Sequence, residues 1–514
     1  YSMRITMNKF IYKTLLGVAL TMPVLTSCEL DQFPEGTIPA EKSWTSVEDA
    51  DKFYIGLLSS LRSIAGSGVN KITEAQADMF NQATSTVTYN EIYDWTFTSS
   101  QFDGDGVWSG NYALISGANA ILDNIDMVPV KNEEEQAAID NIKGVAYFAR
   151  AYGYSNLVTR YCKEYNEETA NVADGGLPLV KTVDINLKPR RSTLEETYTF
   201  ILEDIEKAGE LLPKMGEYTK DITMPQSAAV LALKARVCLN YKKYDAAIEA
   251  ADSVIKNGDY ALVSARNFPT LWTADEGKEI IYQPLLTTDE RAGGSMGSIF
   301  YGYNQSMSMK SASFYPTKKL MSLYETKDAR YKAFFKKTDL CSGQYTSNGY
   351  IFAKFPGNPA LRKANENENN AWYNAPKAFR TAELYLIAAE CYYMKGDTES
   401  KAAALQMLND LRVKRGATKF GEGEVMGDKL MTEIQNEWTR EFCGEGFRLD
   451  GLKRWGLGIV RSANDIQDLD DVLRETPGSY DLVIQPTDAK YQRIVWEIPS
   501  IDRQTNPNLK PNWE

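Results

Sequence analysis

Two glutamates on one apolar helical stretch are the residues whose types could carry out hydrolysis. Glu383 and Glu390 are seven positions apart. An α-helix rises about 1.5 Å per residue, so these carboxylates are separated by roughly 10 Å along the axis. Glycoside hydrolysis uses two carboxyl groups about 5 to 9.5 Å apart. We therefore interpret the glutamates as structural residues that pair with Arg380, Arg412 or Arg415, because buried charges need partners.

A second set of charged residues follows near the C-terminal end of the chain. It alternates acids and bases at helical spacing, in the order Glu437, Arg440, Glu441, Glu445, Arg448, Lys453 and Arg454. Acids and bases three or four residues apart lie on one helix face and can pair. We predict an ion-pair network here and no active site.

The complete absence of histidine restricts the chemistry further. The usual general base of serine, cysteine and threonine nucleophiles is missing, and so is the commonest neutral metal ligand. The sequence from Asp103 to Gly106 (DGDG) is only a fragment of a calcium loop, since the next acidic or amide position and the distal glutamate are lacking. We expect no enzyme, no metal and no cofactor.

Aromatic residues beside amides suggest ligand binding instead. Sugars present flat CH faces that stack on Trp and Tyr, and their hydroxyls hydrogen-bond to amides. Three such clusters fall in segments without helical periodicity, and we take their members as candidate ligand-binding residues: Tyr89, Asn90, Tyr93 and Trp95; Tyr301, Tyr303 and Asn304; Trp372 and Tyr373. For each single ring, packing in a loop or in the core is the competing interpretation.

Other aromatic residues and the cysteines have structural interpretations. Four tryptophans fall in the sequence motifs described below or in periodic helical segments, and we interpret them as structural: Trp44, Trp108, Trp438 and Trp455. Five cysteines are scattered without a C-x-x-C pair, and we expect buried thiols: Cys162, Cys238, Cys341, Cys391 and Cys443. The formal net charge of -12 argues against a nucleic-acid partner, because phosphate binding needs clustered Lys and Arg.

The N-terminal segment has the pattern of a bacterial export signal. Lys9 and Lys13 precede an uncharged, mostly apolar run from Thr14 to Ser27, which is too short to span a membrane as a helix. Leu25 to Cys28 resembles a lipobox, so we predict that residues 1–27 are an upstream extension and signal peptide and that Cys28 is acylated. A plain signal peptide followed by an incidental cysteine is the alternative.

Helical periodicity dominates the remaining chain. Capping-box patterns begin helices at Thr45 to Glu48 and at Ser192 to Glu195, and a long helix is expected from Glu133 to about Arg160. Two helix pairs follow, 226–241 with 244–257 and 379–394 with 398–414, in the arrangement of tetratricopeptide-type units. We predict a mainly α fold in which such pairs carry long, irregular, aromatic-rich loops near residues 63–110, 260–315 and 335–375.

Several motifs along the chain resemble those of the SusD/RagB family of surface lipoproteins. They occur in the family's order: Trp44 with Glu48 to Ala50, Trp108 with Tyr112 and Asn119, Gly176 to Leu179, Ala232 to Arg236, Arg380 to Glu390, Glu441 to Trp455, Ile498-Pro499 and Asn506 to Leu509. The resemblance covers nearly all of residues 28–514, which we therefore expect to form one SusD-like domain. Cys443, Gly444 and Leu449 depart from the family pattern at positions that concern packing.

This resemblance implies a role in nutrient uptake at the cell surface. Family members cap a TonB-dependent, SusC-like transporter in the outer membrane and capture ligand without catalysis. The expected protein is thus lipid-anchored to the outer membrane and binds an oligosaccharide. The acidic residues Glu29 and Asp31 that follow Cys28 resemble the export signal for lipoproteins that face the exterior. A peptide ligand in the same architecture remains open, and a scaffold that binds only proteins would leave the loop aromatics unexplained.

Overall fold

The computed structural model describes residues 43–66, 68–98, 106–217, 220–370, 372–469, 472–473 and 480–513. Residues from Trp44 onward form one compact unit. Cys28 and the DGDG residues 103–105 lie outside the described residues, so the predictions made for them stay predictions.

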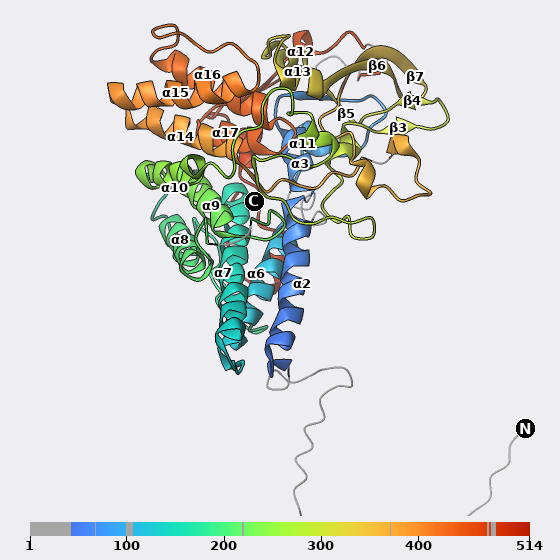
Figure 1. The fold of residues 1–514 in the computed structure, drawn as a ribbon. Helices are drawn as coiled ribbons and strands as arrows, with labels where there is room; N and C mark the ends of the chain where they lie inside the picture. Colours follow the sequence, from blue (N-terminus) through green and yellow to red (C-terminus); the bar gives the residue numbers. More distant parts are fainter. Residues whose placement is uncertain are drawn as a thin grey trace, which may run out of the picture. The chain divides into compact units, whose positions relative to one another are not determined.

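The fold is mainly α, as predicted (Figure 1). The longer helices are α2 (Val47–Ala65), α3 (Val69–Gln76), α6 (Val107–Asn124), α7 (Glu133–Tyr161), α8 (Leu194–Leu211), α9 (Ser227–Asn240), α10 (Tyr244–Asn257), α14 (Thr381–Lys395), α15 (Thr398–Lys414), α16 (Asp428–Phe442) and α17 (Phe447–Arg454). The short ones are α4 (Asn90–Tyr93), α11 (Thr270–Thr273), α12 (Lys318–Ser322), α13 (Ala329–Phe334) and α18 (Ser500–Thr505). Short 3-10 turns include η2 (Met296–Ile299).

Antiparallel helix pairs make up the scaffold. Helix α7 packs on α8, α9 on α10 and α14 on α15, while α10 also contacts α14, so the pairs form a continuous stack (Figure 1). Small residues at the crossings, such as Ala235, Ala247 and Ala388, are completely buried and allow the helices to approach closely. The predicted pairs therefore exist, with ends within about two residues of those expected.

Both predicted capping boxes lie one residue earlier in the sequence than the true caps. Ser46, and not Thr45, caps α2 by accepting a hydrogen bond from the Asp49 backbone N–H at 3.2 Å. Thr193 caps α8 in a capping box with Glu196. The overlapping Ser and Thr residues give two possible registers, and backbone geometry selects one of them.

The strands are short and lie mostly apart from the helix stack. They are β1 (Phe80–Gln82), β2 (Ile280–Tyr282), β3 (Tyr303–Asn304), β4 (Met309–Lys310), β5 (Phe314–Pro316), β6 (Phe335–Ser342), β7 (Tyr345–Phe352), β8 (Phe379–Arg380), β9 (Ile459–Arg461) and β10 (Leu482–Ile484). The largest sheet has the order β3-β4-β6-β7 (Figure 1).

The segments predicted as irregular loops contain more regular structure than expected. Residues 63–110 include α3, β1 and α4, and residues 335–375 include the hairpin β6–β7, paired from Phe335↔Phe352 to Ser342↔Tyr345. A two-residue turn with Gly343 at φ 60° connects these strands. The Ser-Gly dipeptide between two runs with strand-forming residues is the sequence signal that would have indicated the hairpin.

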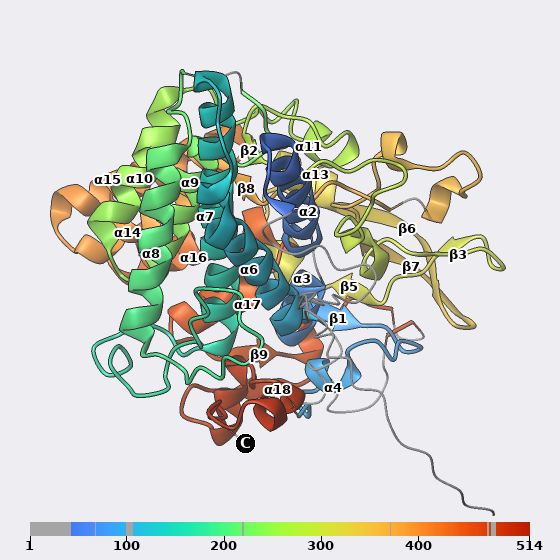
Figure 2. The same cartoon turned by 90° about the horizontal axis from the view of Figure 1, so that it is seen from below.

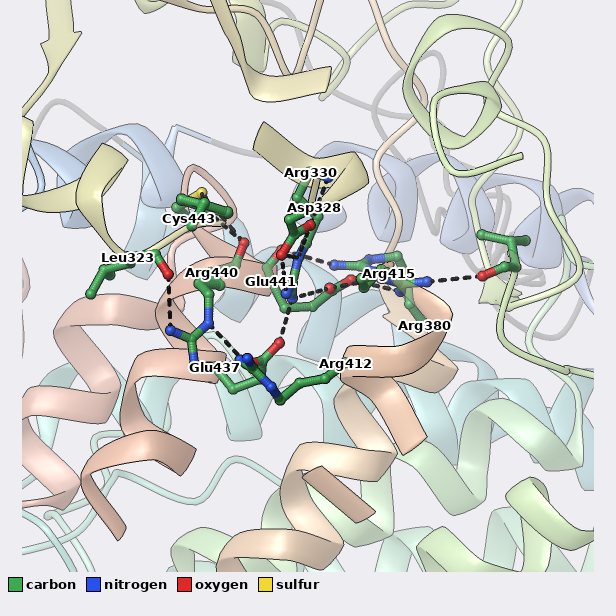
Figure 3. A network of polar contacts seen from close by, with 12 residues as sticks. Leu323, Asp328, Arg330, Arg380, Arg412, Arg415, Glu437, Arg440, Glu441 and Cys443 are labelled. Carbon is green, nitrogen blue, oxygen red and sulfur yellow. Dashed lines mark hydrogen bonds and ion pairs between the residues drawn. The ribbon is translucent and has the colours of Figure 1, made fainter. Parts of the chain in front are cut away.

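A buried ion-pair network joins the later helices, as predicted for the Glu437 to Arg454 region. Glu441 of α16 lies among three guanidinium groups, with N–O distances of 3.0 Å to Arg330, 2.7 Å to Arg380 and 2.8 Å to Arg415 (Figure 3). All four side chains are fully buried. Burial alone raises the pKa of Glu441, but Arg415 and Arg380 hold that pKa well below its usual range. The network therefore remains ionised and ties α13, β8, α15 and α16 together.

The network extends through two more carboxylates. Glu437, one turn before Glu441, contacts Arg330 at 2.7 Å and Arg412 at 2.9 Å (Figure 3). Glu279, next to β2, contacts Arg380 at 3.0 Å and Arg415 at 2.9 Å. Each guanidinium thus contacts more than one acid, which compensates the cost of burying its charge.

The two glutamates considered for hydrolysis are structural, but their partners differ from those expected. Glu383 pairs with Arg236 at 2.5 Å, joining α14 to α9, and Glu390 pairs with Arg454 at 2.7 Å, joining α14 to α17. The residues expected as partners are occupied by Glu441 and its neighbours. All five cysteines in the described residues are free and buried, as predicted.

We expect Glu441→Gln to lower the free energy of unfolding by about 3 to 5 kcal/mol, because it removes a counter-charge that three buried guanidiniums share. Glu48→Gln is the matched control, since Glu48 pairs with Lys52 on the surface and its side chain is 85% exposed. That change should stay within about 0.5 kcal/mol. Urea unfolding followed by circular dichroism measures both, and equal effects would show that the buried network does not stabilise the fold.

Candidate functional site

Two of the candidate rings belong to the hydrophobic core. Tyr93 and Trp95 are 0% exposed. The indole N–H of Trp95 donates a 2.8 Å hydrogen bond to the Gln76 carbonyl, and the guanidinium of Arg461 lies 3.9 Å from the centre of the Tyr93 ring. A ring enclosed on all sides has no face for a sugar, so we correct the prediction for these two residues and assign them to packing.

Arg461 joins the end of α3 to the segment that carries Tyr93. It donates hydrogen bonds to the backbone carbonyls of Ala75, Gln76 and Ala77 at the end of α3, and to that of Tyr93. The C-terminal part of the chain thus closes over this region near α4 (Figure 2). Nothing in the local sequence around Trp95 distinguishes it from a ligand-binding ring.

The other members of the first cluster are partly buried. Tyr89 has φ 62° and precedes α4. Its hydroxyl lies 3.9 Å from the position that a Cβ would take on Gly68, just before α3. Among the described residues, the amide oxygen of Asn90 has no hydrogen-bond partner. Both residues remain candidates for ligand contact.

The second cluster forms a short hairpin with a lysine. Tyr303 of β3 pairs with Lys310 of β4, and the Lys310 ammonium lies 3.8 Å from the Tyr301 ring centre and 5.7 Å from that of Tyr303. Burial lowers the pKa of Lys310 to about 8, and the nearby positive charge of Lys336 makes a smaller contribution in the same direction. The side chain of Asn304 accepts the Met307 backbone N–H at 3.1 Å, which closes the turn. All three candidate residues are partly buried.

A buried aspartate, Asp275, holds the residues that directly follow the third cluster. Asp275 accepts hydrogen bonds from the Ala375 backbone at 3.0 Å and from the Asn374 amide at 3.0 Å. Just before them, Trp372 and Tyr373 are partly buried, and the Arg291 guanidinium lies 4.0 Å from the Tyr373 ring centre.

Arg291 in turn is held by a carboxylate. Its two terminal nitrogens bind Glu366 at 2.7 and 2.6 Å. The hydrogen bond from Arg291 is the largest cause of a lowered pKa of Glu366, about 2, and a hydrogen bond from the Lys363 backbone N–H lowers this pKa further. The cation beside Tyr373 therefore already has a counter-charge, whereas no described carboxylate forms a salt bridge with Lys310.

The turn η2 brings members of all three clusters together. The Gly297 carbonyl accepts the Tyr301 backbone N–H at 2.7 Å, and a Cβ on Gly297 would lie 2.9 Å from the Cβ of Trp372. On the other side, Lys71 of α3 donates to the hydroxyls of Ser295 and Ser298 at 2.9 Å each. Tyr89 lies beside Gly68 at the start of α3, and α3 in turn contacts η2. We call this group the η2 cluster: Tyr89, Tyr301, Tyr303, Trp372 and Tyr373.

The position of η2 depends on two glycines in contact. A Cβ on Gly66, at the end of α2, would overlap the carbonyl oxygen of Gly293, which precedes η2. A Cβ on Gly293, whose φ is 82°, would lie 2.6 Å from the Arg62 carbonyl. Only glycine permits this approach, so the end of α2 sets the position of the loop that carries η2.

The described residues contain no group of three or more acidic or cysteine side chains placed to hold a metal ion. Within the same part of the chain, no helix has the length and apolarity required to cross a membrane. The η2 cluster consists of tyrosine and tryptophan side chains, each of which is partly buried.

Comparison with known protein families identifies the chain's relatives. The family described as "Starch-binding associating with outer membrane" matches residues 42–239, and the SusD family matches residues 335–514. The chain belongs to the SusD/RagB family. SusD-family proteins are binding proteins associated with the outer membrane, and the resemblance inferred from sequence motifs is confirmed.

Individual relatives are distant but match over most of their length. SusD-like protein P25 of Formosa agariphila is 24% identical, with 94% of this chain and 95% of the relative covered. A SusD superfamily protein from Bacteroides vulgatus has a TM-score of 0.73 at 22% identity, covering 91% of this chain and 99% of its own. A SusD-like carbohydrate binding protein from the same species has a TM-score of 0.72 at 20% identity, covering 90% and 97%. These structures show that the SusD fold is shared.

We expect Gly66→Ala in this SusD-family protein to displace the loop before η2 and to lower the free energy of unfolding by about 1 to 3 kcal/mol, because the added methyl group overlaps backbone. Gly56→Ala in the same helix is the control, since no atom lies within 4 Å of its added Cβ. This second change should be neutral or stabilise by up to about 1 kcal/mol. Hydrogen exchange of residues 293–301 together with urea unfolding tests the difference, and equal tolerance of both changes would contradict the role given to Gly66.

Proposed function

We propose that this protein captures a nutrient oligosaccharide at the η2 cluster and delivers it unchanged to a SusC-like TonB-dependent transporter. The gathering of rings from separate segments around one turn is the observation that carries the proposal. Stacked aromatic side chains next to amides and hydroxyls suit the CH faces and hydroxyl groups of sugars. A structural relative described as a carbohydrate binding protein supports the same ligand class.

Binding without catalysis is supported by the state of the acidic residues. Glu383, Glu390 and Glu441 are each held by arginine in buried ion pairs, so none is available as a proton donor or nucleophile toward a bound glycan. The sequence also lacks histidine, which is the most frequent general base in enzymes.

The proposal places the protein on the outer membrane through a lipid on Cys28, facing the exterior. A single acyl chain gives only marginal attachment, and the several chains of a bacterial lipoprotein give a stable one. In this arrangement the η2 cluster faces the transporter, so the ligand is enclosed between the two proteins.

Peptide capture is the second candidate function. Lys310 favours it, because an ammonium group beside Tyr301 without a carboxylate partner among the described residues suits a peptide carboxylate. A peptide site also uses backbone-pairing groups, which the edge strand β3 offers. The glycan proposal rests on the rings, which come from several segments, whereas the peptide proposal rests on one cation.

A glycan array spanning plant, algal, fungal and animal oligosaccharides, followed by calorimetry with the best binder, tests the proposal. We expect Tyr301→Ala and Trp372→Ala each to weaken binding by about 1 to 3 kcal/mol, through loss of a stacked ring. Tyr345→Ala is the control, since this ring on β7 is 41% exposed and lies outside the cluster. The affinity of the Tyr345→Ala variant for the oligosaccharide should equal that of the wild type.

The same sample gives the test for turnover. After long incubation the oligosaccharide should be recovered at its original length. Failure of every glycan to bind, combined with binding of an unfractionated peptide digest that Lys310→Gln abolishes, would replace the glycan by a peptide. Shortened products that increase with protein concentration would contradict the non-catalytic role.

A further inference from the structure

A cavity of about 120 Å³ lies between the helix stack and η2, whose Met296 is one of its lining residues. Its walls come from α2, α3, α6, α7, α8, α9, α11, α14, α16, α17 and η2, and they include Asn70, Tyr152, Asn156, Arg236, Trp272 and Phe447. One water molecule needs roughly 10 to 15 Å³ on this measure. The cavity therefore has room for a molecule of several non-hydrogen atoms.

Charged side chains in the cavity wall are already paired. Arg236 binds Glu383 at 2.5 Å, Arg454 binds Glu390 at 2.7 Å and Lys377 binds Asp275 at 2.9 Å. The remaining charged wall residues are paired too, Arg160 with Asp450 and Glu445 with Lys354. With each charge compensated by the protein, the cavity does not favour an ionic ligand.

Uncharged polar groups in the wall have unused hydrogen-bonding capacity. The Asn70 side chain is partly buried and makes no hydrogen bond to another described residue. The indole N–H groups of Trp272 and Trp438, which are 3% and 5% exposed, likewise have no acceptor in the described part of the chain. Burial raises the pKa of Tyr152, so its hydroxyl stays protonated. Buried polar groups without partners are rare in folded proteins and call for an explanation.

A smaller cavity continues the first toward the surface. It measures about 20 Å³ and shares Val158, Thr159, Tyr198, Asn240, Asp450 and Arg454 with the larger one. Its far end is lined by Lys163, which is exposed. The residues that the two cavities share thus connect the lining of the larger one to the exposed residue Lys163.

We propose that the interior cavity is a second binding site, for an uncharged polyhydroxy molecule of about monosaccharide size. Aromatic walls provide surfaces for CH groups, the amides and indoles provide partners for hydroxyls, and the internal ion pairs leave no net charge to be neutralised. None of the five rings of the η2 cluster lines the cavity, although Met296 of η2 and Asn374, next to Tyr373, do, so variants of the rings and of the cavity wall distinguish the two sites.

Crystals of the protein soaked separately in concentrated D-glucose, D-galactose, D-mannose and D-xylose test the proposal directly. At least one sugar should be found in the cavity, contacting Asn70. Water alone in the cavity after all four soaks would overturn the inference.

Calorimetry with the sugar that binds provides the second arm. Asn70→Leu should weaken the affinity about tenfold, the effect of losing one or two hydrogen bonds from a partly buried amide. It should leave folding intact, because the bond that Asn70 makes to Thr73 uses its backbone carbonyl and not its side chain. Asn156→Phe, which fills the cavity, should abolish binding.

Two controls locate the effect. Asn348→Leu makes the same substitution at an exposed amide on β7 and should leave the affinity unchanged. Tyr303→Ala alters the η2 cluster and should also leave it unchanged. Binding that survives both cavity variants but is lost in Tyr303→Ala would assign the monosaccharide to the η2 cluster and overturn the proposal.

Discussion

The burial of Glu441 among three guanidinium groups is the constraint on which the later half of the fold depends. Arg330, Arg380 and Arg415 come from separate segments, and each is drawn to the same carboxylate on α16 (Figure 3). Glu437, one helical turn earlier, contributes in the same way. Burial raises its pKa, but the charges of Arg330 and Arg440 outweigh burial and lower the pKa to about 2. These charges are therefore fixed at any physiological pH, and their geometry holds the helices in register.

That frame also positions the binding segments. Arg380 starts α14, and the same arginine contacts Glu445, which pairs with Lys354 just after β7. A parallel set of contacts from Asp275 holds Asn374 and Ala375, and thereby the loop that carries Trp372. Rigid support beneath a ring reduces the entropy lost when a ligand orders it. Under the proposed function, these buried contacts thus contribute to recognition of the ligand.

How much of the structure could be predicted from the sequence depends on how far apart in the sequence the contacting residues lie. Helices α9, α10 and α15 follow from apolar spacing within each segment, so their ends could be inferred to within about two residues. The burial of Trp95 could not, because the residues that bond to it, Gln76 and Arg493, lie in other segments of the chain. Tyr301 and Trp95 have similar local surroundings in the sequence, yet one borders η2 and the other fills the core. The partner of Glu383 was missed for the same reason, since Arg236 lies on another helix pair.

The central claim, capture of a glycan at the η2 cluster, is tested most directly by hydrogen–deuterium exchange with and without the oligosaccharide selected on the glycan array. The account predicts slower exchange in residues 296–311 and 372–375, with no change in residues 93–97, which the core already protects. Protection confined to the helix pairs, or to residues 93–97, would contradict it.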